Sequence, residues 1–345
     1  MKQLLKELME TPGVSGQESE IRETIRGHAE QKADSVETDD MGNLIARKGD
    51  GDKTLMVSVH MDQIGLSVMN VDDNGFISFS KVGGVTLQSL MNQRVTVHAE
   101  SGDEVTGVIG MKPPHLMDKE KRDKLPEKEQ LFIDVGAEDS EEVDEMGVRV
   151  GDRITFDREP AEVNGKVTGM AMDNRVGCAL GVDMLERFDE DYELAVVFSV
   201  QEEVGLKGAK TSAFRIDPDV ALAVDVAIAG DVPGVEETES SLELGGGFEI
   251  TLIQGEGRGL ITPEPVKEWL VETAEQEEHD FNRAVGEGGA TDAAKIYLVR
   301  EGIPTGSIGV PLRNMHSATE VVDPSDMEET ADYLENLTGE MENYF

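Results

Sequence analysis

Apolar residues recur at two spacings along this chain, and each spacing predicts a different kind of element. Where apolar residues fall three and four positions apart, they line one face of a helix. Helices are predicted on this basis at 4–8, 21–25, 176–184, 265–275 and 326–337. Nearly continuous apolar runs are typical of strands that helices cover on both faces. Strands of the α/β part are predicted at 43–46, 55–59, 194–200, 220–226 and 303–310.

The pattern changes between about residues 65 and 163, where short alternating segments are separated by glycines and acidic turns. Alternation of apolar and polar positions is the pattern of half-buried strands. Such strands are predicted at 76–79, 94–98, 105–109, 131–134 and 153–156. The charged, proline-containing stretch 112–130 predicts an exposed loop or a short helix. A chain of 345 residues is therefore predicted to be an α/β protein with an inserted β module.

The composition is strongly acidic, with 72 acidic against 31 basic residues and a formal net charge of -41. Such a surface repels nucleic acid and anionic lipid, so neither is expected as a partner. The acids are scattered along the chain, and at molar salt the Debye length shrinks to about 3 Å, which screens their repulsion. This favours a protein from a salt-rich cytoplasm, such as that of a halophilic archaeon. The apolar strands argue against a disordered acidic protein.

The cellular location and the cysteine content follow from simple features. No run approaches the roughly 20 apolar residues that span a bilayer. The N-terminal residues 1–4 are charged and amphipathic and lack the apolar centre of a signal peptide. A cytoplasmic protein is therefore expected. The single cysteine, Cys178, excludes an intrachain disulfide and a cysteine-based zinc site.

Polar residues follow two of the predicted buried strands. His60 and Asp62 come after 55–59, and Glu202 and Glu203 come after 194–200. His60 could bind a metal while Asp62 accepts a hydrogen bond from its other ring nitrogen. Taken alone, the tripeptide at 60–62 is better explained as a polar strand end with a surface histidine, since a short motif is weak evidence. A glutamate pair at a strand end is costly unless solvent or cations neutralise it.

Three more residues complete the candidate set: Asp173, Asp225 and His316. Asp173 precedes a predicted helix, where an N-cap is the simpler explanation and a carboxylate bridging two cations is the alternative. Asp225 lies inside an apolar segment, where an acid needs a partner. His316 follows the strand predicted at 303–310. His28, His98 and His279 have no such setting and are interpreted as structural or surface residues, whereas His115 stays ambiguous.

Together these residues form the inventory that a two-metal hydrolase requires. Such an enzyme needs a few imidazoles, several carboxylates with one shared between the metals, and a spare carboxylate as general base. Oxygen and imidazole ligands accept several divalent ions and do not by themselves select one metal.

The same residues lie in ordered motifs that resemble the TET (tetrahedral) aminopeptidases, a group of two-metal peptidases that includes glutamyl and deblocking aminopeptidases. The motifs occupy residues 11–16, 40–46, 60–62, 171–175, 201–205, 289–293, 302–305 and 311–317. Each motif alone is unspecific, but their order along nearly the whole chain is highly specific. Asn314 and Ala290 depart from the residues common in this family, an aromatic and a glycine.

The resemblance implies a role for each candidate residue. His60 and Asp225 would bind one metal, Glu203 and His316 would bind the other, and Asp173 would bridge them. Glu202 would be the general base, and Asp62 would orient His60. Two divalent ions per subunit are implied, with zinc or cobalt expected.

The resemblance also implies a fold and an assembly. The expected fold is a mixed sheet flanked by helices, the phosphorylase/hydrolase-like zinc-peptidase fold, with an inserted β-barrel-like dimerisation domain. Residues 1–65 and 162–345 would form the catalytic domain and residues 66–161 the inserted domain. Twelve subunits would form a hollow tetrahedral shell.

The implied activity is removal of N-terminal residues from peptides with a free N-terminus, by a metal-activated water. A deacylase or carboxypeptidase of the same broad clan remains an alternative, as does a glycoside hydrolase, which needs two carboxylates and no metal. A non-catalytic scaffold is disfavoured because the full set of proposed ligands is present.

Overall fold

Eight strands form the sheet of the larger domain in the computed structural model, which describes residues 1–122, 124–157 and 159–345. Their order is β1 (Ser35–Thr38), β2 (Leu44–Lys48), β12 (Glu193–Ser199), β3 (Thr54–His60), β13 (Val220–Ile228), β16 (Thr305–Leu312), β14 (Phe248–Ile253) and β15 (Phe281–Val285). The four central strands β12, β3, β13 and β16 run parallel. Their carboxyl ends therefore meet at one edge of the sheet, where open α/β sheets usually bind ligands.

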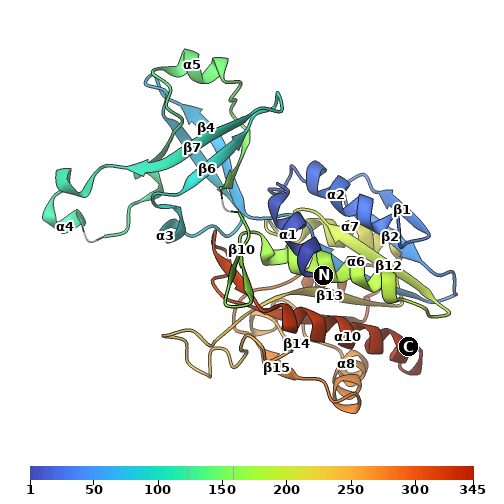
Figure 1. Ribbon diagram of the computed structural model, residues 1–345. Helices are drawn as coiled ribbons and strands as arrows, with labels where there is room; N and C mark the ends of the chain where they lie inside the picture. The colour runs from blue at the N-terminus through green and yellow to red at the C-terminus, as the bar shows by residue number, and fades with distance from the viewer. Residues whose placement is uncertain (123, 158) are drawn as a thin grey trace.

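Helices cover both faces of this sheet (Figure 1). One face packs against α1 (Lys2–Glu10), α2 (Ser19–Ala29), α6 (Met172–Arg187), α8 (Glu264–Gln276) and α10 (Pro324–Glu340). The other face packs against α7 (Lys207–Ile216) and α9 (Ala293–Ile296). The predicted helices are confirmed, and α7 and α9 are additions that the apolar spacing did not predict.

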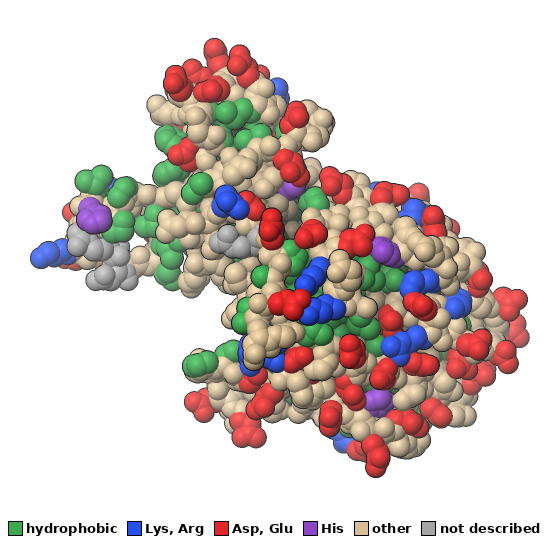
Figure 2. Space-filling model, in the orientation of Figure 1, with side chains coloured by type: hydrophobic (Ala, Val, Ile, Leu, Met, Phe, Trp, Pro, Cys, Tyr) green, Lys and Arg blue, Asp and Glu red, His purple; other side chains and the backbone are tan. Residues whose placement is uncertain are grey.

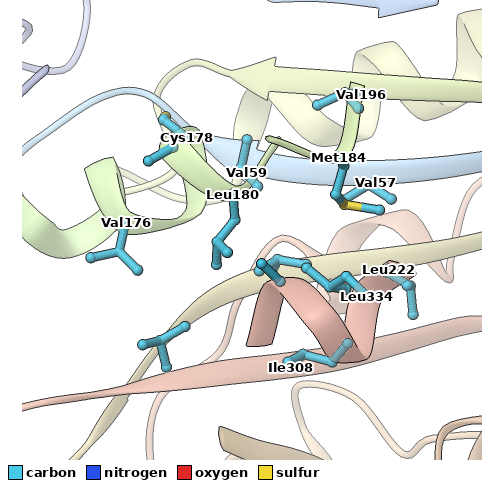
Figure 3. Packing of buried hydrophobic residues seen from close by; sticks show 14 of the residues in the cluster. Val57, Val59, Val176, Cys178, Leu180, Met184, Val196, Leu222, Ile308 and Leu334 are labelled. Carbon is cyan, nitrogen blue, oxygen red and sulfur yellow. The ribbon is translucent and has the colours of Figure 1, made fainter. Parts of the chain in front are cut away.

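Packing on both faces explains the nearly continuous apolar runs. On β3, Val57 and Val59 point to the face covered by α6, whereas Met56 belongs to the cluster under α7 and α9. Figure 3 shows Val59 near Leu180 of α6, and Leu334 of α10 belongs to the same cluster. All these side chains are at most 1% exposed, and each contributes about 1.5–3 kcal/mol through burial.

The chain leaves the α/β domain after β3 and forms a closed β-barrel. Around the barrel the strands are β4 (Gly65–Val71), β5 (Ile77–Val82), β8 (Leu131–Asp134), β7 (Glu104–Met111), β6 (Arg94–His98) and β9 (Arg153–Phe156). The barrel has its own apolar core and stands apart from the α/β domain in Figure 1. Short helices α3 (Leu87–Leu90) and α5 (Ser140–Glu145) connect its strands. The predicted fold class, a mixed α/β sheet with a β-barrel, is confirmed.

The charged stretch 112–130 extends from the barrel as an exposed arm (Figure 1). It contains η1 (Pro114–Leu116), α4 (Lys119–Arg122) and η2 (Lys128–Gln130). The arm thus combines the two predicted possibilities, an exposed loop and a short helix. Residue 123 of this stretch lies outside the described residues.

The chain returns to the α/β domain through a small antiparallel sheet. This sheet pairs β10 (Ala161–Val163) with β11 (Lys166–Gly169) and β11 with β17 (Glu320–Val322). Two further short helices, η3 (Gly255–Gly257) and η4 (Met341–Asn343), lie in the C-terminal half. Because β11 leads directly into α6, the small sheet fixes the start of that helix.

The surface agrees with the acidic composition. Acidic side chains are spread over both domains on the face shown in Figure 2, with lysine and arginine scattered among them. None of the helices in the described ranges is both long and apolar enough to cross a membrane.

Candidate metal centre

The carboxyl ends of the central strands bring the candidate residues together. His60 is the last residue of β3 and lies level with Ser199, the last residue of β12. The glutamate pair follows Ser199 after Val200 and Gln201. The register of β13 against β3 pairs Ala223 with Ser58, which puts Asp225 level with His60. A single edge of the sheet therefore presents imidazole and carboxylate groups from three strands.

Asp173 and His316 reach the same place from neighbouring elements. Asp173 lies in the first turn of α6, with backbone angles that are not helical. The interpretation of Asp173 as an N-cap is wrong, because Ala171 is the N-cap of α6. His316 lies in the loop after β16 with a left-handed backbone, at φ 60°. Gln201, directly before the glutamate pair, has the same left-handed backbone at φ 55°. Ala171, directly before Met172, has it at φ 62°.

The residues form two groups that could each hold a metal ion. One group is His60, Glu202 and Asp225, and the other is Asp173, Glu203 and His316, with the possible ligand atoms of each group within 4.8 Å of one another. Asp173 faces both groups. Its Oδ1 lies 3.0 Å from Nε2 of His60, and its Oδ2 lies 3.3 Å from Nε2 of His316.

The remaining distances place the other carboxylates beside the two histidines. Nε2 of His60 lies 3.6 Å from Oδ1 of Asp225 and 4.0 Å from Oε2 of Glu202. Nε2 of His316 lies 3.6 Å from Oε2 of Glu203. The second oxygen of Glu203, Oε1, is buried without a hydrogen-bond partner among the described residues. A buried carboxylate oxygen without a donor is costly unless a cation or water satisfies it.

The electrostatics of the site favour cations. Burial raises the pKa of Glu202 well above its usual value, and burial with the negative charge of Asp173 raises the pKa of Glu203 to about 8. Burial lowers the pKa of His60, but the charges of Glu202 and Asp225 outweigh this effect and raise it. A hydrogen bond with Asp173 raises the pKa of His316 to about 9. Carboxylates outnumber imidazoles here, so protons or metal ions must neutralise them.

The donor set fits divalent transition metals. It consists of imidazole nitrogens and carboxylate oxygens, which suit zinc, cobalt and similar ions. The thiol of Cys178 points elsewhere, to the backbone oxygen of His60 at 3.2 Å. The residues present are therefore chemically able to hold the two ions that the resemblance implies.

The contacts of Asp62 differ from the expected hydrogen bond between its carboxylate and His60. Nδ1 of His60 meets the backbone oxygen of Asp62 at 3.0 Å, whereas the carboxylate oxygen Oδ1 of Asp62 lies 3.6 Å away. The carboxylate instead accepts from the backbone N–H groups of Glu202 at 2.9 Å and Glu203 at 3.3 Å, and from Oγ of Ser15 at 2.5 Å. Asp62 therefore fixes the glutamate pair as well as lying beside His60.

Several buried polar residues around the site were not predicted from the sequence. Asp292 accepts from Oγ of Ser58 at 2.9 Å and from Oγ of Ser199 at 2.6 Å, which links β3 to β12 near their carboxyl ends. Arg175 is fully buried and donates to the backbone oxygen of Met61. Both residues lie in the motifs at 171–175 and 289–293, so position in a motif was the available signal. Glu320, whose carboxylate accepts from the backbone N–H groups of Met172 and His316, lies outside every motif and carried no such signal.

The other histidines lie outside the site. His28 contacts Glu7, His98 contacts Thr155, and His279 contacts Glu329. His115 is exposed on η1 in the arm of the barrel, away from the ends of the central strands.

Comparisons with known proteins decide the family. Residues 42–333 match the M42 glutamyl aminopeptidase family. The chain belongs to this family. It is therefore an aminopeptidase, a hydrolase acting on peptide bonds, and its family depends on metal ions. The prediction of an aminopeptidase is confirmed.

Three relatives illustrate the similarity of this M42 chain to known proteins. An aminopeptidase from the archaeon Desulfurococcus kamchatkensis is 41% identical with a TM-score of 0.93, covering 97% of this chain and 93% of that chain. The lysyl aminopeptidase of Pyrococcus furiosus is 32% identical over 98% of this chain and 97% of its own length. The TET1 peptidase of Pyrococcus horikoshii, described as assembling into a tetrahedron or a large octahedral shell, is 31% identical with a TM-score of 0.87, covering 97% of this chain and 98% of that chain.

Proposed function

We propose that this M42 aminopeptidase holds two divalent cations, zinc or cobalt, in the two groups described above. His60 and Asp225 bind one cation, Glu203 and His316 bind the other, and Asp173 binds both. The observation that carries this proposal is the position of Asp173, whose two carboxylate oxygens face the two histidines separately. A carboxylate that meets one histidine with each oxygen is suited to bridging two ions.

When bound, the two cations would lower the pKa of a water molecule and polarise the scissile carbonyl. The residues of the chain handle the proton. Glu202 takes it from the attacking water and later delivers it to the leaving amine. Asp62 supports this role because its carboxylate accepts from the backbone N–H of Glu202 at 2.9 Å and fixes that residue at the strand end.

The carboxylate of Glu202 also lies close enough to His60 and Asp225 to share a metal ion with them. Geometry alone therefore allows it to be a ligand or a base. We favour the base because Asp173 already reaches His60, so the first cation has three ligands without Glu202. The substrates of the enzyme in this proposal are peptides with a free N-terminus.

We also propose an assembly and an environment. Dimers form through the inserted domain, residues 66–161, and a catalytic domain of residues 1–65 and 162–345 completes each subunit. Twelve subunits form a tetrahedral shell, a proposal supported by the TET1 peptidase of Pyrococcus horikoshii, which can assemble into a tetrahedron or a large octahedral shell. The net charge of -41 supports a cytoplasm rich in salt, such as that of a halophilic archaeon.

The bridging role of Asp173 is tested by Asp173→Ala. We expect the variant to lose both metal ions and nearly all activity, because the carboxylate serves both sites. Metal content is measured by elemental analysis after gel filtration, and activity is measured with peptides carrying free or acetylated N-termini. The matched control is Asp183→Ala, which removes a partly exposed aspartate from the same helix, where it pairs with Arg187. Full metal content in Asp173→Ala would show that the bridging assignment is wrong.

A further inference from the structure

Glu320 is a buried acid directly beside the candidate metal centre. It begins β17, where it pairs with Gly169 of β11, and it is 1% exposed. The chain continues from Gly169 into Met172 and Asp173 at the start of α6. The strand pairing therefore holds Glu320 alongside the segment that carries the proposed bridging ligand.

The carboxylate of Glu320 links two segments that each carry a proposed ligand. Its Oε2 accepts from the backbone N–H of Met172 at 2.8 Å and, more weakly, from that of Asp173 at 3.4 Å. Its Oε1 accepts from the backbone N–H of His316 at 3.0 Å. The side chain of Glu320 thus fixes the backbone of both Asp173 and His316, which form the second metal group together with Glu203.

Both segments have backbone conformations that need such support. Ala171, directly before Met172, and His316 itself have left-handed backbones at φ 62° and 60°. Residues other than glycine rarely adopt this conformation, and it persists only where surrounding contacts enforce it. Glu320 supplies hydrogen bonds at both places.

Only a carboxylate can make these contacts. An ionised carboxylate accepts at both oxygens, whereas a glutamine amide presents N–H groups at one end. A glutamine at position 320 would therefore direct an N–H group against one of the backbone donors. In the described part of the chain no lysine or arginine forms an ion pair with Glu320, and its carboxylate contacts the backbone N–H groups of Met172, Asp173 and His316.

We propose that Glu320 is a positioning residue that presets Asp173 and His316 for metal binding, as Asp62 presets Glu202 and Glu203. It does not touch the cations or the substrate. The inference rests on the proposed function, since it presupposes that Asp173 and His316 are ligands.

The test compares Glu320→Gln and Glu320→Asp with wild type in Co²⁺ titrations of the metal-free protein, followed by the visible absorption of bound Co²⁺. We expect Kd for Co²⁺ to rise about 10- to 100-fold in both variants, because partners that orient ligands usually contribute that much. At saturating Co²⁺ the KM for a peptide substrate should stay near that of wild type. The matched control is Glu249→Gln, which changes a half-buried acid on β14 that contacts Thr251, and its Kd for Co²⁺ should not change.

A structural role and a positioning role give different results. If the variants of Glu320 lower the melting temperature of the metal-free protein but bind Co²⁺ with the wild-type Kd, the inference is overturned. If Glu320→Gln does not fold, Glu320→Asp decides, because it keeps the charge and shortens the reach by one methylene. Failure of wild type itself to bind Co²⁺ would instead overturn the proposed metal centre.

Discussion

At the scale of residues, neighbouring acids acquire different roles from their surroundings. Glu202 faces His60 and Asp225, whereas Glu203 faces His316 and Asp173. The carboxylate of Asp62 holds the backbone of both glutamates. Asp62 therefore holds the backbone of both glutamates while their side chains point to different metal groups. This allows Glu203 to serve as a ligand and Glu202 as a base.

Glu202→Gln should lower kcat by roughly a hundredfold or more, within the usual range for a general base, while metal content stays near that of wild type. The amide keeps the size of the side chain but cannot take the proton. The adjacent Glu203→Gln is the comparison, and it should lose one metal ion as well as activity. Elemental analysis and steady-state kinetics measure both. Loss of metal in Glu202→Gln would make Glu202 a ligand and leave the base unidentified.

At the scale of elements, the inserted barrel reaches the metal centre through the loop after β5. A Cβ at Gly83 would lie 3.2 Å from Glu203, and a Cβ at Gly84 would overlap the imidazole ring of His316. Two glycines are therefore needed where barrel backbone lies against the proposed ligands. The barrel thus forms part of the site wall as well as a separate domain.

Gly84→Ala should weaken metal binding and lower activity by about tenfold or more, because His316 must shift to make room for the added methyl group. Chelator competition measures the metal affinity. Gly27→Ala is the control: it adds a methyl group on the exposed face of α2, where no atom lies within 4 Å of the added carbon. Unchanged affinity in Gly84→Ala would mean that this loop moves away from His316 in solution.

At the scale of the whole molecule, the net charge of -41 sets the conditions under which the chain folds. Exposed ion pairs are present but each contributes little, about 0–1 kcal/mol. Most surface acids cannot find a basic partner because they outnumber the bases more than twofold. Self-repulsion is therefore a general property of this surface, as Figure 2 illustrates.

The melting temperature should rise with potassium or sodium chloride up to molar concentrations, since the Debye length falls from about 10 Å at 0.1 M to about 3 Å at 1 M. Differential scanning calorimetry of the metal-loaded protein measures this. An uncharged solute at equal osmolality is the control and should give a smaller increase. A melting temperature that is flat or highest in dilute buffer would contradict the proposed adaptation to salt.

Light scattering in high salt should give a mass about twelve times the chain mass of 37.5 kDa. Closed symmetric assembly is the norm for soluble homo-oligomers, and the barrel domain is the proposed dimer contact. Removing salt should dissociate the particle before the subunits unfold, because like charges on different subunits then repel over a longer range. A fully active monomer would refute both the shell and its role in restricting access to the sites.

The sequence by itself determined the strands and the candidates at their ends. Strands buried on both faces must be apolar throughout, so His60 and Asp225 stand out against their neighbours, and the parallel order of β3 and β13 brings them level. The strand β14 and the edge strand β15 were not predicted, because polar residues interrupt both and break the continuous apolar pattern.

Only the tertiary structure decided what holds the candidates in place. Glu320 is one acid among 72 in the sequence, and nothing local distinguishes it. The pairing of β17 with β11 turns it toward the backbone of Met172 and His316. Gly84 likewise became informative once the barrel loop was seen against His316. Such contacts depend on segments far apart in the chain, whereas sequence patterns record the burial of each segment by itself.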